Sequence, residues 1–324
     1  MYDLITIGRC GVDVYPLQTG VGLADVETFG KFLGGSPTNV AVAAARHGLR
    51  SAVITGVGDD PFGEYVRRAI RGFGVDDRYV ATYPEAPTPV TFCEIFPPDH
   101  FPIYFYRGEH PPDLRLTADS LDLEAIGAAR MFWFSLTGLS KEPSAAAHEA
   151  ALTARSDARS DARGDARSDG WTVFDLDYRA SLWPSREAAR AMAARMLPYA
   201  DVAVGNLEEV ETAVGVREPE AAAEALLAAG ARVAIVKLGP EGVHARTREE
   251  SCLVKPVEVS VVNGIGAGDA FGGALCLGLL NDWPLERTIR FANAAGAFVA
   301  ARLACADAMP TTAEVEELLN GVTS

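Results

Sequence analysis

Short apolar runs alternate with helical stretches along most of the chain. The runs Leu4–Gly8 and Ser51–Val57 are typical of buried strands, because they are short and largely apolar. Repeated strand–helix–strand units predict a mostly parallel sheet with helices on both faces, that is, an α/β fold. Four later runs have the same character: Met131–Leu136, Trp171–Leu176, Asp201–Gly205 and Val233–Leu238.

Two of the predicted helices carry start or stop signals. Ser36 is placed to cap the first helix, Pro37 suits its first position, and Gly48 suits the left-handed conformation that ends a helix. Asp60, which is followed by a proline, opens the second helix. We expect this helix to run to about Gly74.

Two regions lack the helix that follows each strand elsewhere. Residues 27–33 and 88–106 look like strands, and in the second region apolar side chains recur at every other position. This spacing indicates a sheet with one buried face. We therefore predict a small β-strand lid, formed from about residues 14–34 and 88–110, on a single domain that spans residues 1–324.

Composition places the chain among ordinary globular proteins. Its 324 residues are 48% hydrophobic and 23% charged, and 44 acidic residues against 29 Lys and Arg give a formal charge of −15. This charge argues against nucleic acid and anionic membrane surfaces as main partners. It permits a small anionic substrate, because a few local cations can outweigh a diffuse negative field.

Cysteine usage and the lack of targeting signals favour a cytoplasmic protein. The five cysteines are an odd number without a C-x-x-C pair, which argues against a disulfide framework and a zinc ribbon. The segment Met1–Gly8 lacks a basic n-region and looks like a strand rather than a signal peptide. The longest nearly unbroken apolar stretch, Ala270–Leu280, is too short to cross a bilayer.

Residues 154–169 form a low-complexity insert. Four tandem units, three of Ala-Arg-Ser-Asp and one of Ala-Arg-Gly-Asp, place like charges four residues apart, which weakens a helix. We predict a solvated helix extension or a mobile loop that is tolerated at the surface.

The strongest chemical signal is a glycine-rich turn before an apolar helical run. Gly266, Ala267 and Gly268 can present successive backbone N–H groups at a helix N-terminus, which makes a cradle for an anion. Asp269 follows at once. A carboxylate beside a phosphate cradle repels its ligand, but it can accept a proton from an attacking hydroxyl. An ordinary glycine loop with a capping aspartate would have the same pattern.

A second glycine-rich segment lies near the N-terminus. Gly34 and Gly35 allow the backbone to approach a ligand closely, and Asn39 lies one turn inside the helix that follows. A simple loop-to-helix connection would contain the same residues. The chain has no G-x-x-x-x-G-K-[ST] motif and no G-x-G-x-x-G after its first strand, which argues against a Walker-type NTPase and a dinucleotide-binding fold.

Together these two segments resemble the PfkB (ribokinase-like) family of carbohydrate kinases, and the resemblance extends from the strand at Leu4 to the helices after Phe291. It implies a three-layer α/β/α sandwich with a small β lid, and transfer of phosphate from ATP to a sugar hydroxyl with the help of Mg²⁺. It also implies Asp269 as the catalytic base and the Gly266–Gly268 turn as the anion hole.

The resemblance implies binding roles for further residues. Glu209 closes an N-x-x-E motif and would contact Mg²⁺ through water. On the sugar side the matching residues are Asp13, a polyol-binding acid, with Gly34, Gly35 and Asn39. On the nucleotide side they are Asn206, Lys237, Gly239, Gly242 and Asn293, the last of them beside the adenine.

One departure from the family pattern concerns a cation. Many members have Asp-Thr before the Gly-Ala-Gly-Asp sequence, whereas this chain has Asn263-Gly264-Ile265. The missing acid weakens the expectation of a monovalent-cation (K⁺) site. The Asn form, together with Gly8–Pro16, Phe105–Arg107, Asp175–Arg179 and Leu182-Trp183, resembles the 5-dehydro-2-deoxygluconokinases of inositol breakdown.

Arginines near the expected cleft suit an acid sugar. A substrate carboxylate needs a fixed cation, and arginine offers a bidentate fork. Arg107 ends a lid strand, and Arg179 follows the carboxyl end of a core strand, which is the edge where open α/β sheets bind ligands. Arg9 is a third candidate. Surface or ion-paired arginines would have the same pattern.

We therefore predict an ATP-dependent kinase that phosphorylates the primary hydroxyl of 5-dehydro-2-deoxy-D-gluconate. Arg107 and Arg179 would hold the substrate carboxylate or the transferring phosphate. A 2-keto-3-deoxygluconate kinase and a neutral-sugar kinase acting on fructose or ribose remain alternatives, as does a non-catalytic sugar- or nucleotide-binding regulator. The strands of the lid also allow a homodimer.

Overall fold

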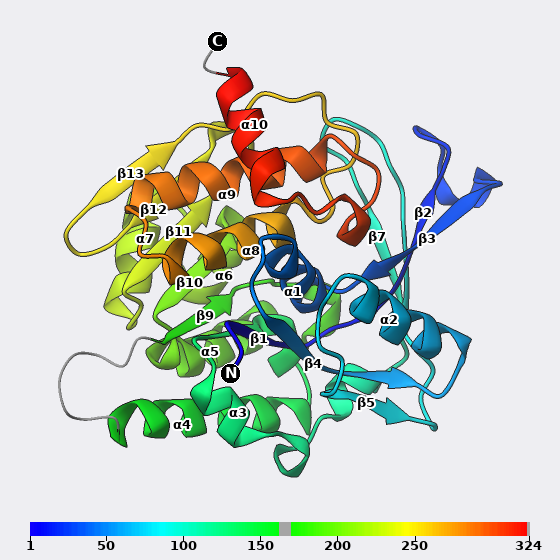
Figure 1. Cartoon of the computed structure of the whole chain (residues 1–324), viewed down its shortest axis with the longest axis horizontal. Helices are drawn as coiled ribbons and strands as arrows, with labels where there is room; N and C mark the ends of the chain where they lie inside the picture. Colours follow the sequence, from blue (N-terminus) through cyan, green and yellow to red (C-terminus); the bar gives the residue numbers. More distant parts are fainter. Residues whose placement is uncertain (162–169, 323–324) are drawn as a thin grey trace.

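A computed structural model describes residues 1–161 and 170–322, which form the predicted α/β architecture with helices on both faces of a large sheet (Figure 1). From β11 to β5 neighbouring strands run parallel, and β12 and β13 add an antiparallel edge. In spatial order the strands are β13 (Ser251–Val254), β12 (Val243–Arg246), β11 (Val233–Lys237), β10 (Val202–Asn206), β9 (Trp171–Asp175), β8 (Met131–Ser135), β1 (Leu4–Ile7), β4 (Ser51–Gly58) and β5 (Val80–Tyr83).

The core is split by this sheet into two apolar layers. Every residue of β1, β4 and β8 is buried, because helices cover both faces. One face carries α1 (Ser36–Arg46), α2 (Pro61–Gly72), α8 (Ala267–Leu280), α9 (Leu285–Ala300) and α10 (Thr312–Val322). The other carries α3 (Leu123–Ala128), α4 (Ser144–Asp161), α5 (Arg186–Met196), α6 (Leu207–Val214) and α7 (Pro219–Ala228). No helix of the described residues is long and apolar enough to cross a membrane.

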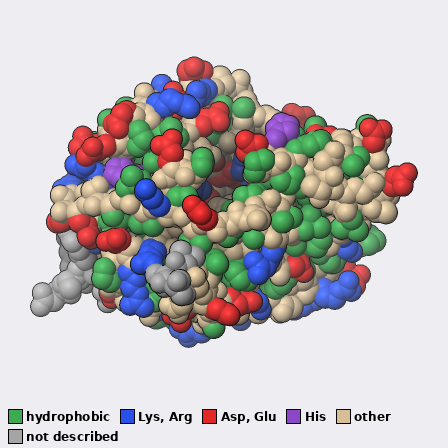
Figure 2. Space-filling view, turned by 90° about the horizontal axis from the view of Figure 1, so that it is seen from above, with side chains coloured by type: hydrophobic (Ala, Val, Ile, Leu, Met, Phe, Trp, Pro, Cys, Tyr) green, Lys and Arg blue, Asp and Glu red, His purple; other side chains and the backbone are tan. Residues whose placement is uncertain are grey.

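A second sheet of four strands lies at one end of the molecule, on the right in Figure 1. Its outer face exposes Phe29 and Tyr106, whose rings both contact Phe92 with centroids 5.8 and 5.4 Å away. Figure 2 shows hydrophobic side chains gathered towards this end. In spatial order the strands are β3 (Phe29–Gly34), β2 (Gly11–Pro16), β6 (Val90–Cys93) and β7 (Ile103–Tyr106).

The helix punctuation is confirmed at Asp60 and Gly48, and it is wrong by one residue at Ser36 and Pro37, where α1 starts. Asp60 caps α2 and accepts a hydrogen bond from the Gly63 N–H at 2.8 Å, and Gly48 has the left-handed conformation with φ 85°. Ser36, however, is the first residue of α1 rather than its cap. The cap is Gly35, with φ 102°, where a Cβ would lie 2.4 Å from the carbonyl oxygen of Arg9. The backbone at Gly35 passes so close to Arg9 that only glycine fits there, and α1 therefore starts directly after Gly35.

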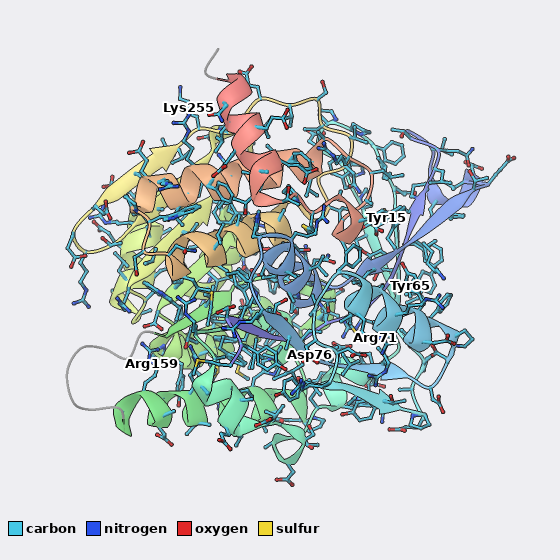
Figure 3. The ribbon with its side chains drawn as sticks, viewed as in Figure 1. Tyr15, Tyr65, Arg71, Asp76, Arg159 and Lys255 are labelled. Carbon is cyan, nitrogen blue, oxygen red and sulfur yellow. The ribbon has the colours of Figure 1, made fainter. Side chains whose placement is uncertain are left out.

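The first half of the low-complexity insert continues α4, and its remaining residues 162–169 lie outside the described part of the chain. The predicted helix extension is confirmed there, but full solvation is wrong. Arg155 is only 1% exposed, and Arg159 donates to both carboxylate oxygens of Asp201 at 2.7 and 3.1 Å (Figure 3). The guanidinium of Arg155 satisfies backbone carbonyls that helix and strand ends leave free. Its acceptors are the Thr172 hydroxyl and the carbonyls of Ile126, Ala129, Arg130 and Trp171.

Candidate active site

A cleft lies at the carboxyl ends of the parallel strands, between the main sheet and the second sheet. This is the edge at which open α/β sheets bind ligands. Arg9 lines the cleft, and so do most of the other predicted residues: Asp13, Gly35, Asn39, Arg107, Arg179, Asn206, Glu209, Lys237, Gly266, Gly268 and Asp269. Among the described residues, the predicted positions that do not line it are Gly34, Ala267, Gly239, Gly242 and Asn293.

Asp269 lies in the first turn of α8, where the helix dipole favours negative charge. Its Oδ2 atom accepts a hydrogen bond of 2.8 Å from Nδ2 of Asn39 on α1, so the two predicted motifs meet here. Burial raises the pKa of Asp269, while hydrogen bonds from Asn39 and Ser36 lower it. A carboxylate with a raised pKa that is held in one orientation is suited to accept a proton.

The glycine-rich turn before Asp269 matches an anion cradle. Gly266 caps α8 with φ 86°, and a Cβ there would lie 2.5 Å from the Cys305 sulfur. A Cβ on Gly268 would lie 3.2 Å from Nζ of Lys237, so an ammonium group stands beside the helix N-terminus. Burial lowers the pKa of Lys237, but nearby carboxylates such as Glu209 outweigh it and raise the pKa, which keeps the charge. The turn therefore offers backbone donors and a cation to a phosphate.

Two aspartates at the end of β9 belong to the cleft, although the sequence reasoning gave them no role. Burial raises the pKa of Asp175. Asp177 binds Nη2 of Arg9 through Oδ2 at 2.6 Å, and its Oδ1 lies 2.8 Å from Nε of Arg179. Burial raises the pKa of Asp177, but the charges of Arg179 and Arg9 outweigh it and hold the pKa low. Their position after a buried strand was the signal that could have found them.

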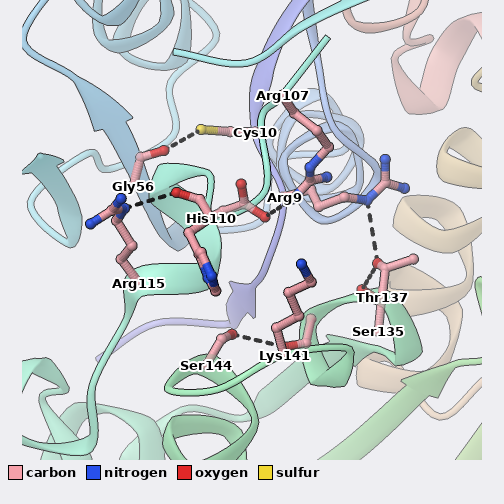
Figure 4. Close-up of polar contacts among 12 residues, drawn as sticks. Arg9, Cys10, Gly56, Arg107, His110, Arg115, Ser135, Thr137, Lys141 and Ser144 are labelled. Atoms are coloured by element: carbon pink, nitrogen blue, oxygen red, sulfur yellow. Dashed lines mark hydrogen bonds and ion pairs between the residues drawn. The ribbon is translucent and has the colours of Figure 1, made fainter. Parts of the chain in front are cut away.

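The arginines are held differently. Arg9 is 8% exposed and donates from Nε to Thr137 at 3.3 Å, whereas the adjacent Cys10 turns towards the carbonyl of Gly56 (Figure 4). Arg107 lines the cleft, but its Nη2 atom binds Asp113 at 2.7 Å, and these two side chains are 7% and 0% exposed. Arg107 therefore has a structural partner that the sequence pattern did not reveal.

Asp13 enters the cleft from the middle of β2 and is 7% exposed. The pKa of Asp13 is raised to about 6, mainly by burial. A hydrogen bond from the Tyr15 hydroxyl at 2.7 Å offsets part of this rise. Gly34 leaves the space that this carboxylate fills, because a Cβ there would lie 2.1 Å from Oδ1 of Asp13. Tyr15 also lines the cleft, and sequence reasoning missed it. Its spacing of two residues from Asp13 on a strand was the available signal.

Asn206 and Glu209, which were predicted to lie near the nucleotide and its metal, form a capping box at the start of α6. The Asn206 N–H donates to Oε2 of Glu209 at 2.6 Å, and the Glu209 N–H donates to Oδ1 of Asn206 at 2.9 Å.

Asn293 lies outside the cleft and donates from Nδ2 to the carbonyl of Lys255 at 2.9 Å. Gly242, with φ 106°, shapes the turn after β11, where a Cβ would lie 2.1 Å from the carbonyl oxygen of Val254.

Asn263 occupies the position at which the family pattern has an acid. It is fully buried, its Nδ2 donates to the carbonyl of Leu303 at 2.7 Å, and its Oδ1 accepts from the Ile265 N–H at 3.0 Å. A monovalent cation needs oxygen ligands, whereas here an amide N–H₂ group already points at the carbonyl. These residues do not fit a K⁺ site built around this side chain.

Comparison with known proteins agrees with this geometry. Residues 1–312 match the model of the pfkB family carbohydrate kinases, so the chain belongs to this family and is an ATP-dependent sugar kinase. This leaves the interpretation as a non-catalytic regulator without support.

Among its curated relatives is the 5-dehydro-2-deoxygluconokinase of Geobacillus kaustophilus (strain HTA426), which is 31% identical over 323 residues that cover 98% of this chain and 93% of that protein. Two solved structures show the same fold. A fructokinase of Xylella fastidiosa with bound ATP has a TM-score of 0.85 at 23% identity and full coverage of both chains. A protein of E. coli described as a ribokinase II, in complex with ATP and Mg²⁺, has a TM-score of 0.87 at 22% identity, over 99% of this chain and 100% of that one.

Proposed function

We propose that this kinase transfers the γ-phosphoryl group of ATP to the primary hydroxyl of 5-dehydro-2-deoxy-D-gluconate. The observation that carries the chemistry is the position of Asp269, held by Asn39 at the N-terminus of α8 in a cleft that also contains three arginines. The full-length similarity to proteins named 5-dehydro-2-deoxygluconokinase supports the choice of sugar.

In this proposal Asp269 is the general base. The sugar oxygen forms a bond to the γ-phosphorus, the bond from that phosphorus to the bridging oxygen of ADP breaks, and the hydroxyl proton passes to the Asp269 carboxylate. Asn39 keeps the accepting carboxylate in place. The N–H groups of the Gly266–Gly268 turn and the ammonium of Lys237 stabilise the charge on the transferring group.

The carboxylates of the cleft fit Mg²⁺ held mainly through water and phosphates. The described residues contain no group of three or more His, Cys, Asp or Glu side chains that could hold a metal by themselves. Mg²⁺ is commonly bound through one or two carboxylates, several waters and the substrate phosphates. Glu209 and Asn206 would hold it through water, and when bound the ion neutralises charge on the phosphates.

Arginines that line the cleft would bind the substrate carboxylate or the transferring phosphate. Arg179 is 39% exposed at its side chain, so its guanidinium can reach a ligand while it stays beside Asp177. Nη2 of Arg9 binds the other carboxylate oxygen of Asp177. Arg107 contributes from the end of β7, although Asp113 engages one of its nitrogens. A 2-keto-3-deoxygluconate kinase would need the same cations, and a neutral-sugar kinase would not.

The test is ADP release from Mg²⁺-ATP with four sugars: 5-dehydro-2-deoxygluconate, 2-keto-3-deoxygluconate, fructose and ribose. We expect the highest kcat/KM with the first. A preference for 2-keto-3-deoxygluconate would keep the carboxylate site and change the sugar. A preference for fructose or ribose would contradict a carboxylate-binding role for the arginines.

The exposed aromatic face of the second sheet supports a homodimer through the lid, with a second copy of this chain covering it. Phe92 lies between Phe29 and Tyr106 at the centre of this face. Sedimentation velocity should give twice the mass of the chain, and Phe92→Glu should give a monomer because it places a charge in the contact. A wild-type monomer at micromolar concentration would contradict this assembly.

We place the enzyme in the cytoplasm. All five cysteines lie in the described residues and are free thiols, as expected for a protein kept in a reducing compartment. The substrate ATP is consistent with that location. Fractionation of cells that produce the tagged protein checks it.

A further inference from the structure

A chain of polar contacts connects the sugar side of the cleft to the anion-hole turn. The Tyr15 hydroxyl lies 2.7 Å from Oδ2 of Asp13 and 2.8 Å from Sγ of Cys305. The same sulfur lies 3.2 Å from the carbonyl oxygen of Ile265, the residue before Gly266. Figure 3 shows Tyr15 where the second sheet meets the segment that follows α9. Three parts of the chain that are remote in sequence are therefore joined by two side-chain protons.

The number of protons limits how this network can be arranged. Burial raises the pKa of Tyr15 and of Cys305 well above their ordinary values, so each group keeps one proton. The ionised Asp13 only accepts, and the hydroxyl of Tyr15 therefore donates to it. The thiol proton of Cys305 is then shared between the Tyr15 oxygen and the Ile265 carbonyl. Tyr15 has no second proton to offer, and its orientation is fixed.

Packing fixes the tyrosine as firmly as the hydrogen bonds do. Tyr15 is 1% exposed, and its ring lies 5.4 Å from that of Phe32 on the adjacent strand. Cys93 and Cys305, both fully buried, complete a small apolar cluster with it. A hydroxyl placed in such a cluster costs free energy unless it is paired, which is why its two partners matter.

We propose that Tyr15 is a positioning residue of this kinase: its hydroxyl fixes the carboxylate of Asp13 and connects it, through the Cys305 thiol, to the turn that forms the anion hole. The proposal rests on the proposed function in one respect, namely that Asp13 binds hydroxyl groups of the sugar. Tyr15 itself does not need to touch the reacting atoms.

The network also sets the pH range in which Asp13 can bind the sugar. Asp13 must be ionised to accept two hydroxyl groups, and the hydrogen bond from Tyr15 favours the ionised form. Without that bond the pKa of Asp13 rises further, so sugar binding is lost at a higher pH. The other titratable or charged groups that face Asp13 are Arg9 before β2, Asp269 on α8, Tyr65 on α2, Cys93 on β6 and Cys305.

The first variant is Tyr15→Phe, assayed with whichever sugar the wild-type enzyme phosphorylates best. The KM for the sugar should rise about tenfold or more, and the KM for ATP should stay within about twofold. The acidic limb of the kcat/KM profile for the sugar should move up by about one pH unit. A merely structural role would lower the yield or melting temperature without moving that limb or separating the two KM values.

Tyr104→Phe is the matched control. Tyr104 also lies on the second sheet and also donates to a carboxylate, Oε2 of Glu94 at 3.1 Å, but it is 41% exposed and outside the cleft. Its loss should leave both KM values and the pH profile unchanged. If Tyr15→Phe behaves like this control, the proposal is overturned.

If Tyr15→Phe folds poorly, variants of Cys305 test the part of the network that connects Tyr15 to the anion-hole turn. Cys305→Ala should lower kcat several-fold with little change in the KM for the sugar, because the anion-hole turn loses its contact while Asp13 keeps Tyr15. Cys305→Ser keeps a donor of similar size and should restore most of kcat. Equal kcat for wild type and Cys305→Ala would overturn the connection to the anion hole.

Two further results separate this proposal from the proposed function. A wild-type enzyme that prefers another sugar contradicts the substrate and leaves the Tyr15 experiments intact, because Asp13 would bind hydroxyls of that sugar. Carboxyl ¹³C NMR then gives the pKa of Asp13 directly, without turnover, and it should be higher in Tyr15→Phe. An unchanged KM for the sugar in Asp13→Asn would overturn both the role of Asp13 and this inference.

Discussion

The two sheets contribute to the cleft in different ways. The main sheet contributes the ends of its strands: Asp175, Asn206 and Lys237 are the last residues of β9, β10 and β11, three neighbours in the parallel order. The second sheet contributes one of its faces, on which Asp13 and Tyr15 lie two residues apart in the middle of β2. In the proposed function, groups for the phosphates therefore come from a sheet edge, and groups for the sugar come largely from a sheet face.

The difference follows from how each sheet is covered. Helices pack on both faces of the main sheet, so only its edge is free to bind a ligand. Helix α2 packs on only part of the outer face of the second sheet, where aromatic rings stay exposed, and the opposite face opens into the cleft. We expect substitutions at the strand ends and at α8 to change the transfer step, and substitutions on the face of the second sheet to change sugar binding.

The largest effect is expected at the base. Asp269→Asn should lower kcat at least about 100-fold, because the amide cannot accept the hydroxyl proton. The KM for the sugar should change far less, since Asn39 can still hold the side chain. Steady-state kinetics with Mg²⁺-ATP measures both values.

The matched control for that experiment lies at the other end of the same helix. Asp282 follows α8 with φ 50°, a conformation that asparagine tolerates well, so Asp282→Asn should keep normal kinetics. An Asp269→Asn enzyme with near-normal turnover would rule out the carboxylate as general base.

The two arginine–aspartate pairs sharpen the comparison between sheets. Arg107→Ala, at the end of β7, leaves the fully buried Asp113 without its cation and should lower the free energy of unfolding by about 3–5 kcal/mol. Arg179→Ala, at the end of β9, should cost much less, because Asp177 keeps Arg9. Urea unfolding of the two variants measures the difference.

The same two proteins can be tested with the sugar panel. Arg179→Ala should lower kcat/KM for acid sugars more than for neutral ones. Equal losses of stability in the two variants, or equal losses on both kinds of sugar in Arg179→Ala, would contradict the proposal that Arg107 contributes more to the stability of the fold than Arg179 does and that Arg179 binds the acid sugar.

A moderate effect is expected for the stability of the sugar side. Burial raises the pKa of Asp13 to about 6 from an ordinary value of 3.8, so the folded chain holds this proton more tightly than the unfolded chain does. Stability is therefore lost as the pH rises from the ordinary pKa of 3.8 to the pKa of about 6 in the folded chain. Above about pH 6 the ionised Asp13 destabilises the fold.

Asp13→Asn should accordingly stabilise the protein by about 3 kcal/mol at pH 7.5 and by almost nothing at pH 4, while it weakens sugar binding. Thermal unfolding at the two pH values measures this. A variant that is equally stabilised at both pH values, or destabilised at pH 7.5, would contradict the role assigned to ionisation.

The smallest effect concerns K⁺. Asn263 joins the anion-hole turn to Leu303 through its amide, where a cation could otherwise bridge oxygens. Replacing K⁺ by a large organic cation at constant ionic strength should change kcat by less than about twofold, since no bridging ion is lost. A strong and saturable activation by K⁺ would show that a cation site exists elsewhere near the turn.

Patterns that depend on neighbours in sequence were predicted well. The strand runs, the Asp60 cap of α2 and the glycine-rich turn before Asp269 are local features, and the structure has them in place. The Ser36 cap failed because the close approach of Arg9 to Gly35 is a contact between segments that no local pattern contains.

The same limit explains the residues that sequence reasoning missed. Asp177 matters because it lies between Arg9 and Arg179, and Tyr15 because Cys305 lies against it from a distant part of the chain. Whether Arg107 is ion-paired was left open, because Asp113 reaches it only after the chain has folded back. Roles that arise from pairs of distant side chains need the three-dimensional arrangement.

The two arginines in the helical part of the low-complexity insert have a consequence for how the length of this insert can change. Arg155 and Arg159 occupy equivalent positions in the first two of four tandem units. Because the sequence repeats every four residues, a chain that gains or loses one unit still has an arginine at positions 155 and 159. The number of units can therefore change while Arg155 and Arg159 still anchor the end of α4.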